Sequence, residues 1–120
     1  MDEDDRVYLH SEFAIASGKI GEFKKIAQEL IDVVEEKESK TLRYQWYFNM
    51  DESKCYLVEE YPNAAALRVH VLHAGLNVRK LLKVSKVTRF TVLGKLSRVP
   101  RKALTASGAQ NFRYWNGLVR

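Results

Sequence analysis

The strongest constraint on the fold is the order in which strand-like and helix-like segments follow one another. Four segments alternate apolar and polar side chains, as half-buried β-strands do, and they span residues 6–16, 41–50, 54–61 and 86–94. Two segments carry apolar residues at helical spacing, and they span residues 19–37 and 64–85. The predicted order is therefore β-α-β-β-α-β. This is the ferredoxin-like α+β pattern, in which an antiparallel sheet carries both helices on one face.

The ends of the two predicted helices carry local signals. Ser17 and Asn63 have side chains that can accept a hydrogen bond from the first turn of a helix, so each is an expected N-cap. Gly75 predicts an interruption of the second helix. The charged residues 35–40, EEKESK, predict that the first helix ends in solvent.

The length of the chain predicts one domain. At 120 residues the chain can bury one core, and no linker or internal repeat divides it. We expect an acidic N-terminal tail at residues 1–5 and a single domain at residues 6–120. Within that domain, residues 97–120 form a C-terminal extension, predicted as a short helix ended by Gly108 and an aromatic strand.

The second predicted strand contains the aromatic run TLRYQWYF, whose two faces differ. Its apolar side is formed by alternate residues, namely Leu42, Tyr44, Trp46 and Phe48. Its amphipathic side is formed by Arg43, Gln45 and Tyr47. Helices cover only one face of a ferredoxin-like sheet, so the apolar side is expected beneath them. The amphipathic side would be bare in a monomer, which predicts a homodimer joined sheet to sheet.

Composition and charge limit the expected partners. Residues 1–60 carry a net charge of −7 and residues 61–120 carry +12, which suits either an anionic ligand or attraction between the two halves. The basic residues follow no recognition-helix or zinc-finger pattern, so nucleic acid is not an expected partner. No apolar run is long enough to span a bilayer, and a single cysteine excludes an internal disulfide framework. We therefore expect a cytoplasmic protein without a membrane partner.

The middle of the chain carries a resemblance to a known family. Three short motifs follow one another along the chain. They are Leu-Arg-Tyr-x-Trp at Leu42, Arg43, Tyr44 and Trp46, Glu-x-Tyr at Glu59 and Tyr61, and Ala-x-x-x-His at Ala66 and His70. In order and spacing these segments resemble the antibiotic-biosynthesis-monooxygenase (ABM) family of small dimeric α+β barrels, and the resemblance runs from about Val7 to the C-terminus. Two departures are Gln45, where similar sequences commonly carry an acidic residue, and EKESK, which lacks the family's Glu-Pro-Gly turn.

The resemblance implies a catalytic set and a reaction. Some family members oxygenate phenols without metal or flavin: they deprotonate the substrate in a dry pocket, and the anion reacts with oxygen. His70 is the expected base because histidine titrates near neutral pH, and Glu59 would orient it. Tyr44, Trp46 and His73 are the expected substrate-binding residues. The implied function is a cofactor-independent monooxygenase acting on a quinol-like or polycyclic aromatic substrate, with no cofactor and no metal.

Other accounts of these residues remain open. His70 and His73 are neighbours on a helix surface and could simply contact backbone or solvent. Glu59 could form a cross-strand ion pair with Arg43. Haem degradation, which some family members perform, would need His70 or His73 to face an open pocket. The alternative function is a non-catalytic dimeric barrel that binds a small aromatic or anionic ligand, as the basic second half of the chain suggests.

Overall fold

A computed structural model describes residues 5–96, 102 and 108–120 of the chain. The elements are β1 (Val7–Ile15), α1 (Ile20–Lys37), β2 (Arg43–Phe48), β3 (Lys54–Tyr61), α2 (Ala64–Leu81), β4 (Ser85–Gly94) and β5 (Gln110–Phe112). The predicted β-α-β-β-α-β order is confirmed. The terminal aromatic strand predicted over residues 111–120 is much shorter than expected, because β5 covers only Gln110–Phe112 and residues 113–120 are not a strand. The helix predicted before it, over residues 98–108, lies almost entirely outside the described residues.

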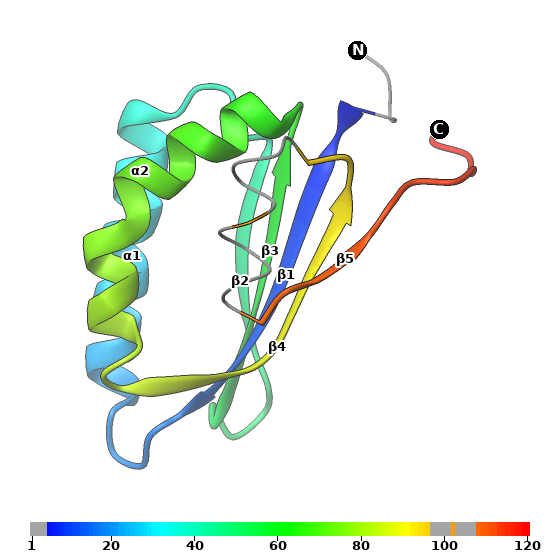
Figure 1. Ribbon diagram of the computed structural model, residues 1–120. Coiled ribbons are helices and arrows are strands. Elements are labelled where there is room, and N and C mark those ends of the chain that lie inside the picture. The colour runs from blue at the N-terminus through cyan, green and yellow to red at the C-terminus, as the bar shows by residue number, and fades with distance from the viewer. Residues whose placement is uncertain (1–4, 97–101, 103–107) are drawn as a thin grey trace.

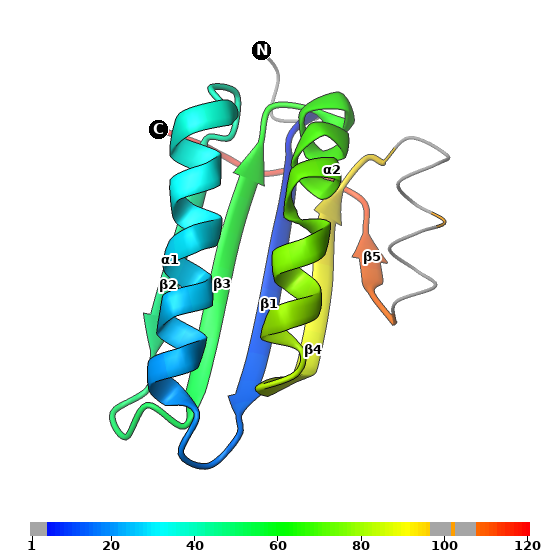
Figure 2. The same cartoon turned by 90° about the vertical axis from the view of Figure 1, so that its left-hand side faces the viewer.

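The strands form one mixed sheet with both helices on the same face. Its strand order is β2-β3-β1-β4-β5, in which β4 and β5 are parallel and the other neighbours are antiparallel. Figure 2 shows α1 in front of β2 and β3, and α2 in front of β1 and β4. The C-terminal tail runs along the opposite face of the sheet (Figure 1), where Val119 lies near Tyr8 and His10. None of the described helices is long and apolar enough to cross a membrane.

The alternation within β1 decides which side chains reach the helices. Val7, Leu9 and Phe13 are buried in two apolar clusters between the sheet and the helices. The register places Glu59 of β3 between Leu9 of β1 and Tyr44 of β2. Because cross-strand neighbours point to the same side of a sheet, all three side chains lie on the helix-covered face.

The two faces of β2 are divided as its sequence predicted, with one exception. Tyr44, Trp46 and Phe48 are partly buried and pack against the core formed by Phe13, Phe23 and their neighbours. The amphipathic side, Arg43, Gln45 and Tyr47, is exposed. Leu42 was expected under the helices, but it precedes the strand and is 48% exposed.

Of the three signals predicted for the helices, the cap at Asn63 is confirmed, whereas the cap at Ser17 and the interruption at Gly75 are not. The side chain of Asn63 caps α2 by accepting a hydrogen bond from the Ala66 backbone N–H, at 2.9 Å, as predicted. The prediction for Ser17 is wrong, because a turn through Gly18, with φ at +75°, delays the start of α1 to Ile20. The predicted interruption at Gly75 is also wrong, since α2 runs unbroken through it. A glycine inside a helix costs only about 1 kcal/mol, which packing of the helix against the core can outweigh.

Candidate functional site

A cavity of about 630 Å³ lies between α2 and the sheet. Most of its lining is apolar, with Phe13, Trp46 and Leu57 among the contributing side chains. Glu59 and His70 add polar groups to the lining. The volume lies in the range of pockets that bind small organic molecules, and the combination of apolar walls with a few polar groups is typical of such pockets.

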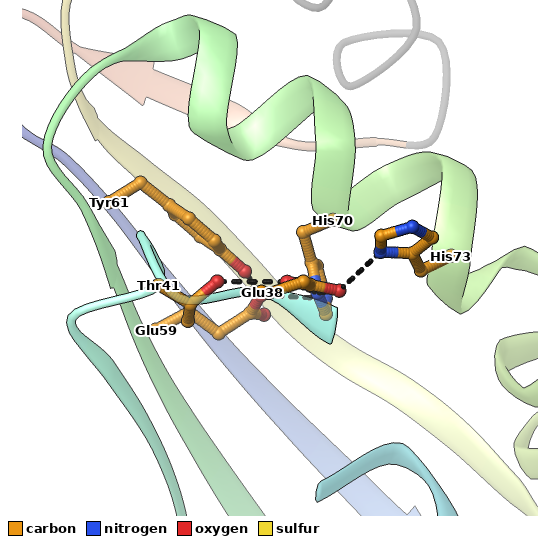
Figure 3. Close-up of polar contacts among 6 residues, drawn as sticks. All are labelled: Glu38, Thr41, Glu59, Tyr61, His70 and His73. Atoms are coloured by element: carbon orange, nitrogen blue, oxygen red, sulfur yellow. Dashed lines mark hydrogen bonds and ion pairs between the residues drawn. The ribbon is translucent and has the colours of Figure 1, made fainter. Parts of the chain in front are cut away.

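The imidazole of His70 is held between two carboxylates (Figure 3). Its Nδ1 lies 2.9 Å from Oε1 of Glu38, and its Nε2 lies 3.4 Å from Oε1 of Glu59. The Tyr61 hydroxyl donates a 2.6 Å hydrogen bond to the same Glu59 oxygen. The ring of Tyr44 also meets that of His70, with centroids 5.1 Å apart. These contacts fix the orientation of the imidazole from both sides.

Glu38 is a buried carboxylate beside His70 that the sequence did not reveal. The segment 35–40 was expected to end α1 in solvent, yet the Glu38 side chain is only 2% exposed. It follows the last residue of α1 and turns inward, where it binds His70, His73 and the Thr41 hydroxyl. Within a run of four charged residues, no local signal separates the one that is buried from those that are solvated.

The two carboxylates have pKa values displaced in opposite directions. Burial raises the pKa of Glu59, and the attraction of His70 and the hydrogen bond from Tyr61 only partly oppose it. Burial also acts to raise the pKa of Glu38. There the charge of His70 and the hydrogen bonds from Thr41, His73 and His70 outweigh it, so the pKa of Glu38 is lowered.

These contacts determine where the protons lie. An ionised Glu38 can only accept hydrogen bonds, so Nδ1 of both His70 and His73 carries a hydrogen that it donates. Nε2 of neutral His70 is then an acceptor, as is an ionised Glu59. The contact between them is favourable only when a proton lies between the two atoms. The Glu59–His70 pair can therefore take up one proton at the wall of the cavity.

Trp46 brings an unsatisfied hydrogen-bond donor to the cavity lining. Its indole N–H is buried and finds no acceptor among the described residues. A buried donor without a partner costs about 1–3 kcal/mol. An acceptor atom of a bound ligand would remove that cost.

Four of the predicted site residues come together and one stands apart. Tyr44, Trp46, Glu59 and His70 all line the cavity. His73 does not line it: its side chain is 33% exposed, and its Nδ1 lies 3.0 Å from Oε2 of Glu38. The role predicted for His73 in substrate binding therefore has no support from its position.

The proposed cross-strand ion pair of Arg43 involves a different acid. Arg43 pairs with Glu60, at 3.3 Å, on the open face of the sheet. Glu59 points the other way because successive residues of a strand alternate in direction. The account of Glu59 as a partner of Arg43 is therefore wrong.

The geometry does not suit a metal or haem iron. No group of three or more His, Cys, Asp or Glu residues within the described part of the chain could hold a metal ion. Both ring nitrogens of His70 face carboxylates, which leaves neither free for iron. His73 does not line the cavity.

The antiparallel sheet with both helices on one face, together with the cavity under α2, defines an ABM-like α+β fold. Comparison with solved structures confirms this fold. MupZ from Pseudomonas fluorescens superposes with a TM-score of 0.84 at 20% identity, over 97% of this chain and 95% of that one. A candidate antibiotic biosynthesis monooxygenase from Bacteroides thetaiotaomicron has a TM-score of 0.64 at 16% identity, over 79% and 91% of the two chains.

A third similar structure is SnoaB from Streptomyces nogalater, a cofactor-independent oxygenase, with a TM-score of 0.64 at 14% identity, over 80% of this chain and 98% of that one. No family profile and no curated protein matches the sequence. At these identities the similarity establishes the fold alone, so the activity has to be argued from the site.

The opposite pKa displacements predict opposite pH dependences of stability. The lowered pKa of Glu38 contributes stability that is present above its ordinary value of 4.5 and is lost as the pH falls below it. The raised pKa of Glu59 instead lowers stability as the pH rises above 4.5. Urea unfolding from pH 3 to 7 should show the free-energy difference between wild type and Glu38→Gln growing with pH. The difference between wild type and Glu59→Gln should fall with pH, and equal slopes for the two variants would contradict these assignments.

Proposed function

We propose that the protein is a cofactor-independent monooxygenase acting on a quinol-like or polycyclic aromatic substrate that binds beneath α2. The observation that carries the proposal is the Glu59–His70 pair, which lies at the wall of a mainly apolar cavity. Such a pair can remove the proton of a phenol or enol that binds against the apolar wall of the cavity.

The pair acts as a base when Glu59 is ionised and His70 is neutral. The substrate O–H then gives its proton to the pair, where the proton lies between Oε1 of Glu59 and Nε2 of His70, and Glu59 stabilises the imidazolium that results. The hydrogen on Nδ1 of His70 remains bonded to that nitrogen and hydrogen-bonded to Glu38, which keeps the ring oriented. The substrate anion is left beside a positive charge, which favours its formation.

The rest of the reaction draws its electrons from the substrate. The anion reduces dioxygen, so the protein has to supply only deprotonation, exclusion of water and stabilisation of the anion. For an anthrone, one oxygen atom becomes the carbonyl of the oxidised carbon and the other leaves as water. The similarity to SnoaB, which is a cofactor-independent oxygenase, supports this class of reaction at the level of the fold.

Trp46 supports binding of a substrate that carries an oxygen acceptor. Its unpartnered indole N–H can donate to a carbonyl or phenolate oxygen, and its ring forms part of the aromatic wall with Phe13, at 6.2 Å between centroids. A polycyclic ring with oxygen substituents can pack against the aromatic wall and accept the hydrogen bond of the Trp46 N–H.

Activity should be tested by oxygen consumption with a panel of reduced quinones and anthrones. The wild-type protein should turn over at least one of them, and His70→Ala should lower turnover by roughly 100- to 10,000-fold, as expected for loss of a general base. His10→Gln is the matched control, because His10 bonds Tyr56 on the opposite face of the sheet. Absence of turnover across the panel, or equal activity in His70→Ala, would refute the proposal. Ligand binding without oxygen uptake would favour a non-catalytic binding barrel.

The donor role of Trp46 can be tested by binding of 1,8-dihydroxyanthraquinone, followed by fluorescence. Trp46→Phe keeps an aromatic wall but removes the N–H, so the dissociation constant should rise by about tenfold, the effect of one hydrogen bond. Phe48→Leu is the control, since Phe48 lies on the same side of β2 but does not line the cavity. Equal weakening in both variants would mean that packing, and not the donor, accounts for the loss.

We further propose that the protein acts as a homodimer that covers the open face of the sheet. On that face Tyr47 is 52% exposed and Arg43 and Gln45 are joined by a 2.7 Å hydrogen bond. The tail that follows β5 exposes more apolar surface, with Trp115 90% exposed. Large amphipathic and aromatic side chains on an uncovered sheet face are typical of protein interfaces.

The dimer predicts a solution mass of about twice 13.9 kDa by sedimentation equilibrium. Tyr47→Glu, which places a charge in the proposed interface, should shift the population toward monomer. Met50→Glu serves as the control because Met50 lies fully exposed in the turn after β2. A monomeric wild-type protein would rule out the dimer.

A further inference from the structure

We propose that Glu38 couples His70 to His73, so that proton uptake by His70 in the cavity is matched by proton release from His73 to solvent. The inference rests on the proposed function, in which His70 takes the proton of the substrate. It assigns roles to two residues outside the cavity and explains why a carboxylate is buried at the end of α1.

One carboxylate joins the two imidazoles (Figure 3). Oε1 of Glu38 lies 2.9 Å from Nδ1 of His70, and its Oε2 lies 3.0 Å from Nδ1 of His73. The inner two members of this chain are buried and the outer one is not. The His70 side chain is 8% exposed and that of Glu38 is 2%, whereas that of His73 is 33%. The inner imidazole lines the cavity and the outer one reaches solvent.

Glu38 faces both imidazoles, whereas Glu59 faces His70 but lies in no described contact with His73. When two titratable groups share a counter-ion at this distance, protonation of one disfavours protonation of the other, and the pair titrates as a unit. The shared carboxylate therefore makes the protonation of His73 depend on events at His70 in the cavity.

The proposed exchange conserves both protons and charge. Before the reaction, His73 is an imidazolium and His70 is neutral, with its hydrogen on Nδ1. The substrate O–H bond breaks and its proton binds Nε2 of His70, while His73 releases its Nε2 proton to water. The cluster keeps its net charge, the substrate becomes an anion, and one proton has entered solvent. Glu59 stays ionised beside His70, and water receives the proton that leaves His73.

The groups that face His70 come from every element packed around it. They are Glu38 at the end of α1, Glu59 and Tyr61 on β3, and Tyr44 on β2. Burial raises the pKa of both tyrosines, which therefore stay neutral over the working pH range. Glu38 is the group that faces His73 as well as His70. Among the described residues Glu59 contacts His70 and Tyr61 but not His73, so it serves as the uncoupled acid.

The first test uses substrate-free protein. The ring ¹⁵N resonances of its three histidines are followed by NMR as the pH is varied. In His73→Gln the competing positive charge is gone, so the His70 titration should move to higher pH, by on the order of half a unit or more. In Glu38→Gln the counter-charge is gone, so the His70 titration should move to lower pH by about one unit or more. His10 is the internal control, and its titration should be the same in all three proteins.

Turnover provides the second test, with the substrate identified by oxygen consumption. The pH–rate profile should move to higher pH in His73→Gln and to lower pH in Glu38→Gln, whereas a merely structural role would lower the rate without opposite shifts. Unchanged His70 resonances in His73→Gln would overturn the coupling, and that result needs no substrate. Coupled resonances in a protein without oxygenase activity would instead retain the coupling and refute the proposed function.

Discussion

The structure depends most on the enclosure of one imidazole between two buried carboxylates. His70 is carried by α2, Glu59 by β3, and Glu38 by the end of α1, so this contact joins both helices to the sheet. Charged groups lose solvation when they are buried, and they are tolerated only where partners replace the lost water. Removing one member of such a group leaves another without its partner, and therefore the three positions depend on one another.

Two adjacent glutamates show how the sheet separates structural and chemical roles. Glu59 and Glu60 follow one another on β3, and the strand sends their side chains to opposite faces. Glu60 pairs with Arg6 and Arg43 on the open face. Glu59 points beneath α2, where it contacts His70 and Tyr61. The same residue type is therefore fixed as an ion-pair partner at one position and available for proton transfer at the next.

The cavity and the proposed coupling describe one site with two accessible ends. The inner end is the mainly apolar cavity lined by His70, whereas the outer end reaches solvent through His73. In the proposed coupling, a proton taken up at the cavity wall is matched by one released at His73, so the charge of the cluster stays constant.

The sequence by itself determined the order of the elements and the helix-covered face of β2. The family resemblance singled out Tyr44, Trp46, Glu59 and His70, which all line one cavity. Alternation and helical spacing are local properties, and they specify which side of an element is buried without any knowledge of its partners. Only the tertiary structure decided that Gly75 lies within a continuous helix, that Arg43 pairs with Glu60, and that Glu38 is buried against two histidines. Each of these depends on contacts between segments far apart in the sequence. Glu38 and His70 are 32 positions apart, and nothing in the composition of EEKESK distinguishes a carboxylate that will meet a histidine from one that will meet water.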